Sequence, residues 1–134
     1  RNPMSWHILT PPTHVDPRGA LTAIDEHEFP FVPKRVYWIH DVPAGTIRGA
    51  HAHREQHQIL VCLSGRLSVP LDNGHGRTET VILDDPRFAL HIEPMVWSHQ
   101  QALDAGTRWV FIASGRLDPA EYVRTPDDFR ALFA

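Results

Sequence analysis

Short runs of alternating apolar and polar residues recur along most of the chain. Alternation with period two is typical of half-buried β-strands, because successive side chains point to opposite faces. Many apolar residues in these runs are β-branched or aromatic, which favours strands further. The pattern predicts strands at Trp6–Leu9, Ala20–Asp25, Arg35–Asp41, His57–Leu63, Arg66–Leu71, Thr78–Leu83, Ala89–Ile92 and Trp109–Ala113.

Turn residues separate these runs at regular intervals. The segment Asp16–Gly19 predicts one turn, and Asp72-Asn73-Gly74 predicts another. Because Asn-Gly accepts the positive φ angles of a two-residue type I′ turn, we expect a tight hairpin at the second site. Strands at intervals of about 8–12 residues, with no helix between them, indicate an all-β sandwich or barrel.

Only the C-terminus has a helical pattern. Thr125 is a suitable N-cap, Pro126 fits the first helical position, and Asp127 and Asp128 lie at the positive end of the helix dipole. Phe129 and two later apolar residues share one face. We therefore expect a short C-terminal helix that packs on the barrel or on a partner.

Length and composition restrict the class of protein. The 134 residues suffice for one core, so we expect residues 1–134 to form a single domain. The net charge is −3 with no basic cluster, which argues against nucleic acid or an anionic membrane as partner. No apolar run approaches the ~20 residues of a membrane span. The single cysteine, Cys62, lies in an apolar run, and a cytoplasmic protein is expected.

The candidate chemistry begins with His51 and His53, which follow Arg48. Residues at i and i+2 of an extended chain point to the same face, so the two imidazoles share one surface. Such a pair transfers protons or binds a metal ion, and these residues alone leave both possibilities open. His57 stands next to Gln58 and is expected on the opposite face.

The spacing around the histidine pair resembles the first cupin motif. The chain reads Gly45-x5-His51-x-His53-x4-Gln58-x6-Gly65. Glutamine stands at the position where many cupins carry a metal-binding glutamate. Both histidines therefore match the motif, whereas Gln58 replaces a carboxylate that could bind a metal with a neutral amide.

A second segment resembles the second cupin motif. It runs from Pro94 to His99 and lacks the glycine of that motif. Together the two motifs imply an all-β cupin fold, the double-stranded β-helix or jelly-roll barrel. In such a barrel the motifs face one interior pocket, which would bring His99 together with His51, His53 and Gln58.

Longer blocks are similar to those of the sugar 3,4-ketoisomerases, cupins that act on dTDP-4-keto-6-deoxyglucose. The similar blocks are residues 16–19, 34–39, 48–54, 58–65 and 121–124. The resemblance implies an isomerase that moves the ketone of a dTDP-linked 4-keto-6-deoxysugar from C4 to C3 without a cofactor or metal. Related cupins form homodimers, some with exchanged N-terminal strands, and Trp6–Leu9 is the candidate strand for such an exchange.

The same resemblance implies catalytic and binding roles. His51 would be the principal base, and His53 its partner in moving protons. Tyr37 would donate a hydrogen bond to the developing enolate oxygen. Arg48 and Arg18 would hold the sugar or the pyrophosphate by charge-assisted hydrogen bonds.

Three further residues are candidates for the substrate pocket. Gln58 would hydrogen-bond to His51 or His53 and set its tautomer. Trp97 would stack on thymine or close the barrel mouth. Ser98 stands where the family carries a larger polar or basic side chain that helps set the C4 epimer, which leaves the product stereochemistry open.

His99 is also a candidate for the substrate pocket, and it keeps a metal-dependent alternative open. With His51 and His53 it would form a three-histidine set, which Gln58 could complete, suited to Fe²⁺, Mn²⁺, Ni²⁺ or Zn²⁺, as in a dioxygenase-like cupin. A third alternative is a non-catalytic cupin that binds sugar nucleotides, in which Ser98 marks lost activity.

Overall fold

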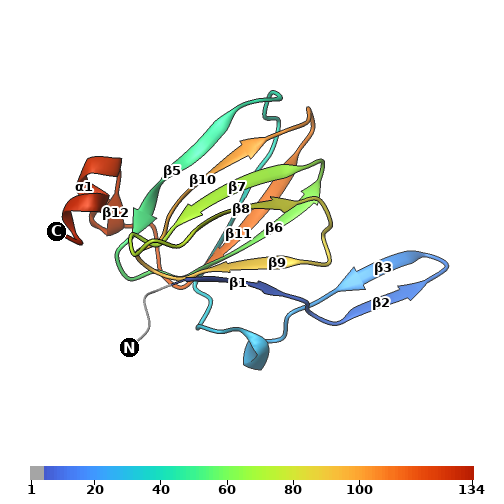
Figure 1. The fold of residues 1–134 in the computed structure, drawn as a ribbon. Coiled ribbons are helices and arrows are strands. Elements are labelled where there is room, and N and C mark those ends of the chain that lie inside the picture. Colours follow the sequence, from blue (N-terminus) through green and yellow to red (C-terminus); the bar gives the residue numbers. More distant parts are fainter. Residues whose placement is uncertain (1–4) are drawn as a thin grey trace.

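The computed structural model describes residues 5–134, in which two five-stranded antiparallel sheets pack face to face (Figure 1). The first sheet contains, in spatial order, β1 (Trp6–Leu9), β9 (Ala89–Ile92), β6 (Gln58–Ser64), β11 (Arg108–Ala113) and β4 (Arg35–Ile39). The second contains β12 (Tyr122–Val123), β5 (Ile47–His53), β10 (Trp97–Ala102), β7 (Leu67–Asp72) and β8 (Thr78–Leu83). This arrangement is the all-β, cupin-like barrel that the sequence predicted.

The inward-facing side chains of both sheets form the main core. Leu60 and Trp109 of the first sheet and Leu67 and Val69 of the second are completely buried. Alternation is clear along these strands because their inner positions are apolar. The predicted strands at 6–9, 78–83 and 89–92 have the observed bounds, and most of the others shift by one or two residues.

Three strands of the second sheet were not predicted: β5, β10 and the two-residue β12. In β10 the inner positions carry Ser98 and Gln100, whereas the outer positions carry Trp97 and His99. With polar residues inside and an aromatic residue outside, β10 lacks the usual alternation of apolar inner and polar outer positions. Both β5 and β10 bring polar side chains into the barrel, which is why neither has a clear hydrophobic pattern.

A separate hairpin, β2 (Thr13–Asp16) and β3 (Gly19–Thr22), extends away from the barrel (Figure 1). The turn predicted at Asp16–Gly19 joins its strands. The strand predicted at 20–25 ends earlier, and β2 was not predicted. Nearly every residue of this hairpin is exposed, so no inside-and-outside alternation marks it.

The hairpin between β7 and β8 has a longer loop than the sequence predicted. Residues 73–77 connect the strands, with positive φ angles at Gly74 and Gly76. The buried Asn73 side chain accepts hydrogen bonds from the backbone N–H groups of His75 and Arg77. The prediction of a two-residue turn was wrong because the asparagine side chain organises a wider loop.

The predicted C-terminal helix is present as α1 (Pro126–Ala131). The Thr125 hydroxyl accepts a hydrogen bond from the Asp128 N–H group at 3.1 Å and caps the helix. Phe129 is buried against Trp97 and Val123.

Two short 3₁₀ turns occur at Glu26–Glu28 and Pro119–Glu121. Within residues 5–134, no helix has both the length and the apolar character to cross a membrane.

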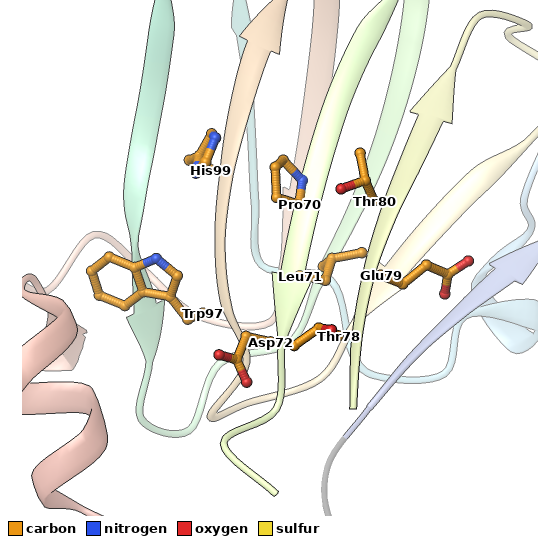
Figure 2. Close-up of a pocket in the computed structure, with 8 residues that line it drawn as sticks. All are labelled: Pro70, Leu71, Asp72, Thr78, Glu79, Thr80, Trp97 and His99. Atoms are coloured by element: carbon orange, nitrogen blue, oxygen red, sulfur yellow. The ribbon is translucent and has the colours of Figure 1, made fainter. Parts of the chain in front are cut away.

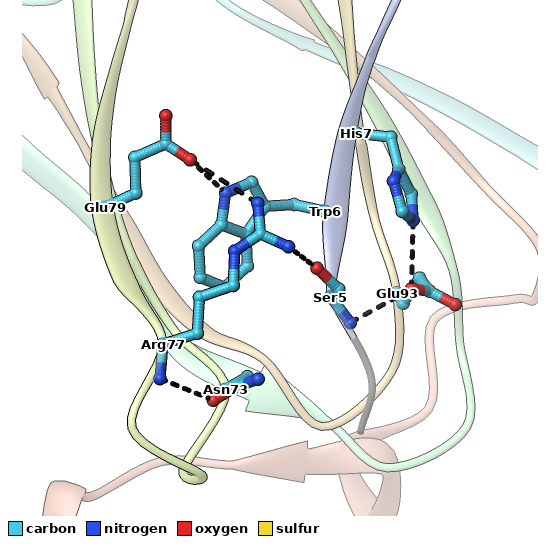
Figure 3. A network of polar contacts seen from close by, with 7 residues as sticks. All are labelled: Ser5, Trp6, His7, Asn73, Arg77, Glu79 and Glu93. Carbon is cyan, nitrogen blue, oxygen red and sulfur yellow. Dashed lines mark hydrogen bonds and ion pairs between the residues drawn. The ribbon is translucent and has the colours of Figure 1, made fainter. Parts of the chain in front are cut away.

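The N-terminal strand β1 is held within its own chain (Figure 3). Trp6 is buried, and its indole N–H donates to a Glu79 carboxylate oxygen at 2.6 Å. The Arg77 guanidinium lies 4.1 Å from the centre of the Trp6 ring. On the other side of the strand, His7 lies 3.2 Å from Glu93. In this single chain β1 lies beside its own β9, and the exchange of Trp6–Leu9 between two copies stays a prediction.

Candidate active site

His51 and His53 lie together on the inner face of β5. Their Nε2 atoms are 3.2 Å apart, and the two rings meet edge to face with centroids 4.8 Å apart. His53 is buried, and its backbone carbonyl accepts a hydrogen bond from the Met95 N–H group. The same-face arrangement follows from the i, i+2 spacing. At this distance the two imidazoles can share a proton.

A β-bulge places Arg48 on the same face as the histidines. On β10, Ser98 pairs with His51 and Gln100 pairs with Arg48, so β5 has one extra residue between these pairs. Gly49 adopts a φ of +69°, and a Cβ atom there would lie 2.5 Å from the Gln100 side-chain oxygen. Without the bulge, residues 48 and 51 would face opposite sides of the sheet.

Tyr37 faces the same interior from β4, whereas its neighbour Trp38 is exposed on the outer face. The Tyr37 ring stacks on Phe111 with centroids 4.9 Å apart. The Gln58 side-chain N–H donates to the Tyr37 hydroxyl oxygen at 2.7 Å. Gln58 therefore bonds to the tyrosine, and the expected hydrogen bond to the histidine pair was wrong. The Arg35 guanidinium lies 4.3 Å from the centre of the Tyr37 ring.

Tyr122 was not predicted as a site residue. Its strand, β12, pairs it with His53, and its ring lies 4.7 Å from the His51 ring and 4.8 Å from the His53 ring. The Arg124 guanidinium lies 4.5 Å from the centre of the Tyr122 ring. Since β12 has only two residues and follows a loop, no periodic pattern identifies it. Arg35 was detectable, because it is two residues from Tyr37 on the same strand.

Burial makes the two histidines weak bases. The pKa of both His51 and His53 is lowered from 6.5 to about 4, mainly by burial, and the neighbouring His53 and Arg124 contribute to the shift at His51. Arg35 contributes to the lowered pKa of His53. Both imidazoles are therefore neutral at neutral pH and able to accept a proton. The buried Nδ1 atom of His53 has no hydrogen-bond partner among the described residues.

Tyr37 has the opposite property. Burial, together with the nearby Tyr122, raises the pKa of Tyr37 to about 12, although Arg35 and the Gln58 hydrogen bond act to lower it. The phenol thus keeps its proton at neutral pH. A neutral base pair and a protonated phenol in one interior are the groups that a proton transfer next to a carbonyl requires.

Trp97 and His99 do not join this interior. Figure 2 shows them on the outer face of the second sheet, in a shallow pocket that Pro70, Asp72 and Thr80 also line. Trp97 packs instead against Phe129 of α1. Because side chains alternate along β10, the inward Ser98 forces both neighbours outward. The prediction that Trp97 and His99 line the substrate pocket beside His51 and His53 was therefore wrong.

The outward position of His99 also removes the three-histidine metal set. His51 and His53 lie on the inner face of the sheet and His99 on the outer face, so they cannot coordinate one ion together. Within residues 5–134, no three or more His, Cys, Asp or Glu side chains are grouped so as to hold a metal ion.

Arg18 lies outside the site of its own chain. It sits at the turn of the β2–β3 hairpin, its side chain is exposed, and its guanidinium pairs with Asp16 at 2.6 Å. The hairpin extends away from the barrel that contains the histidines (Figure 1).

The family model described as FdtA: WxcM-like, C-terminal matches residues 4–134. The chain belongs to this sugar 3,4-ketoisomerase family. A TDP-4-oxo-6-deoxy-α-D-glucose-3,4-oxoisomerase from Aneurinibacillus thermoaerophilus is 38% identical over 121 residues, which cover 90% of this chain and 86% of the relative.

Solved structures agree with this membership. A 3,4-ketoisomerase from Helicobacter canadensis has a TM-score of 0.90 and 32% identity, and the match covers 96% of this chain and 97% of that one. A variant of the 3,4-ketoisomerase QdtA from Thermoanaerobacterium thermosaccharolyticum, in complex with TDP-4-keto-6-deoxyglucose, has a TM-score of 0.89 and 30% identity. That match covers 95% of this chain and 92% of the other.

Proposed function

We propose that this protein converts a TDP-linked 4-keto-6-deoxyhexose to its 3-keto isomer by acid–base catalysis with the pair His51 and His53. The observation that carries the proposal is the contact of two neutral imidazoles, 3.2 Å apart, in an interior that also holds a protonated phenol. Activities of related 3,4-ketoisomerases support the substrate class.

The first step removes the proton at C3 of the sugar. This proton is acidic because C3 is adjacent to the C4 ketone. His51 accepts it, the C–H electron pair forms the C3–C4 double bond, and charge develops on the C4 oxygen. Tyr37 donates a hydrogen bond to that oxygen and stabilises the charge.

The second step returns a proton to the sugar at C4. The charged C4 oxygen takes the proton of the neighbouring C3 hydroxyl, the C3 ketone forms, and the electrons of the double bond take a proton from the His51–His53 pair at C4. The net change moves one hydrogen from C3 to C4 and one from the C3 oxygen to the C4 oxygen. The reaction is thus balanced without an external oxidant or reductant. The pair needs only to hold one proton between the steps, which two contacting imidazoles do.

We assign substrate binding to the residues that share the inner face of the second sheet with the histidines. Arg48 carries a positive charge suited to the pyrophosphate, and the bulge at Gly49 directs its side chain to the same face as His51. Ser98 pairs directly with His51 across the two strands, which supports a contact between its hydroxyl group and the sugar.

Incubation with TDP-4-keto-6-deoxyglucose in deuterated water tests the function. We expect ¹H NMR to show the 3-keto product with deuterium at C4, together with loss of the C3 proton signal from recovered substrate. A chelator-treated sample should react at the same rate as an untreated one. A protein that binds the sugar nucleotide without any exchange would be a non-catalytic binding module, and a rate that depends on added metal would contradict metal-independent catalysis.

We also propose that the chain forms a homodimer through the outer face of the first sheet and the β2–β3 hairpin. Val36 and Trp38 are exposed on this face, and Val15 and Leu21 are exposed on the hairpin. Large exposed apolar groups are typical of interfaces, and a two-fold dimer is the simplest closed assembly. An exchanged hairpin would bring Arg18 to the partner's pocket, where its predicted binding role becomes possible.

Sedimentation velocity and mixing of inactive variants test the dimer. We expect a mass of twice the 15.2 kDa chain. A mixture of Arg18→Ala and His51→Asn proteins should regain activity, because each mixed dimer contains one intact site. A monomer at assay concentrations would contradict the dimer, and mixed dimers without recovery would contradict the role of Arg18 in the partner's site.

We propose a cytoplasmic location. Cys62 is the only cysteine of the chain, and it is a buried free thiol, so the fold does not depend on a disulfide. A single cysteine that forms no disulfide is typical of proteins from reducing compartments.

A further inference from the structure

We propose that Gln58 is a positioning residue that holds the Tyr37 hydroxyl as a hydrogen-bond donor toward the substrate. This inference rests on the proposed isomerase function. Gln58 is 5% exposed on β6, and its side-chain N–H donates to the Tyr37 oxygen at 2.7 Å. Stacking on Phe111, with ring planes only 17° apart, fixes the phenol ring beside it.

The direction of this hydrogen bond determines where the phenol proton points. A phenol has one proton to donate and accepts through its oxygen. The amide N–H of Gln58 occupies the accepting side, so the phenol proton cannot point toward that nitrogen. It points elsewhere in the interior, where it can reach a substrate oxygen.

The residue type at position 58 follows from this geometry. A carboxylate only accepts hydrogen bonds. Glutamate at this position would therefore accept a hydrogen bond from the Tyr37 hydroxyl, and the phenol proton would point away from the substrate. Glutamine has nearly the same shape but donates, which explains an amide at a position where metal-binding cupins carry a carboxylate.

The amide also favours proton donation electrostatically. A hydrogen bond donated to a phenol oxygen stabilises the negative charge that grows there as the phenol proton moves toward an acceptor. Gln58 and Arg35 both lower the pKa of Tyr37 against the larger effect of burial. Gln58 thus orients the phenol and makes it a better donor to an enolate oxygen.

Two substitutions of similar size separate orientation from packing. Gln58→Leu removes the donor, and we expect kcat to fall about 10- to 100-fold with little change in KM, part of the effect of losing an oxyanion donor. Gln58→Glu should show a similar loss at neutral pH. As the pH falls, its rate relative to the wild type should recover, because a protonated carboxyl group again donates to the Tyr37 oxygen. The Gln58→Leu rate relative to the wild type should not recover.

The double variant Gln58→Leu/Tyr37→Phe should be no slower than Tyr37→Phe alone, because Gln58 acts through the phenol. Wild-type kcat in Gln58→Leu, or fully additive losses in the double variant, would overturn the proposal. Circular dichroism and thermal unfolding of each variant identify losses that arise from misfolding.

A measurement without turnover separates this inference from the proposed function. The chain has two tyrosines, so a Tyr122→Phe protein labelled with [¹³Cζ]tyrosine reports on Tyr37 alone. We expect the Tyr37 resonance to shift when Gln58→Glu is added to this labelled protein, as the hydroxyl changes from acceptor to donor. A shift without isomerase activity in the wild type would reject the proposed function and retain the hydrogen-bond direction. An unchanged resonance would overturn the inference.

Discussion

Two pairs of contacting histidines occupy opposite faces of the barrel wall. His51 and His53 meet on the inner face with Nε2 atoms 3.2 Å apart. His57 and His91 meet on the outer face of the first sheet, where Nδ1 of one lies 2.9 Å from Nε2 of the other. Burial lowers the pKa of His91 to about 4, as it does for the inner pair.

The surroundings distinguish the pairs. Two phenols and two arginines face the inner pair. Around the outer pair, Phe31 contacts both rings, and the His7 ring lies 5.8 Å from the His91 ring. The outer pair joins β1, β6 and the segment before β4. Because both pairs have a short contact and a lowered pKa, the proposed catalytic role of the inner pair rests on the phenols and arginines around it.

The largest expected effect is on the inner pair. His51→Asn should lower kcat by about 10²- to 10⁴-fold, the usual contribution of a general base. Because the pair acts as a unit, adding His53→Asn should lower kcat little further. Steady-state kinetics on the 4-keto sugar nucleotide measure both. Strictly additive losses would show that the two imidazoles act independently.

A smaller effect is expected at the bulge that aligns the inner site. Gly49→Ala combines a positive φ with a close approach to Gln100, so it should lower kcat/KM up to about 100-fold by displacing Arg48 and His51. It should also destabilise the fold by about 1–3 kcal/mol. Gly76→Ala is the matched control, since its φ is +91° but nothing lies within 4 Å of the added methyl group. Equal kcat/KM in both variants would contradict the role of the bulge.

The outer pair should affect stability and its pH dependence. The pKa of His91 is about 4 in the folded protein and near 6.5 in the unfolded chain. Between these values the unfolded state binds more protons, so the free energy of unfolding falls as the pH falls from about 6.5 to about 4. His91→Asn should make this decrease shallower in urea titrations while isomerase activity at pH 7 stays near wild type. An unchanged slope would show that His91 does not contribute.

The smallest effect is expected at the outward-facing residue of β10. His99→Ala should leave kcat and KM within about twofold, because surface substitutions away from special features rarely matter. Ser98→Ala, its inward neighbour, is the comparison and should raise KM. A large loss in His99→Ala would place that histidine in the substrate pocket after all.

Much of the site was predictable because it depends on local geometry. The i, i+2 spacing places His51 and His53 on one face, and strand alternation separates Tyr37 from Trp38 and His57 from Gln58. The C-terminal helix was predictable from Thr125 and Pro126.

Other features depend on contacts between distant segments. The partner of Gln58 is fixed by how β4 lies beside the interior, not by its neighbours in sequence. Tyr122 reaches the histidines through a two-residue strand. Trp97 and His99 were placed wrongly because the motif gives only the spacing of residues along the chain. The face of the sheet to which their side chains point depends on the register of β10 with β5.

The most direct test of the central claim compares hydrogen exchange at C3 in His51→Asn and His91→Asn proteins. With TDP-4-keto-6-deoxyglucose in deuterated water, NMR follows the loss of the C3 proton signal. We expect His91→Asn to exchange this proton at nearly the wild-type rate and His51→Asn to exchange it at least about 100-fold more slowly. Equal exchange by the two proteins would contradict proton transfer by the inner pair.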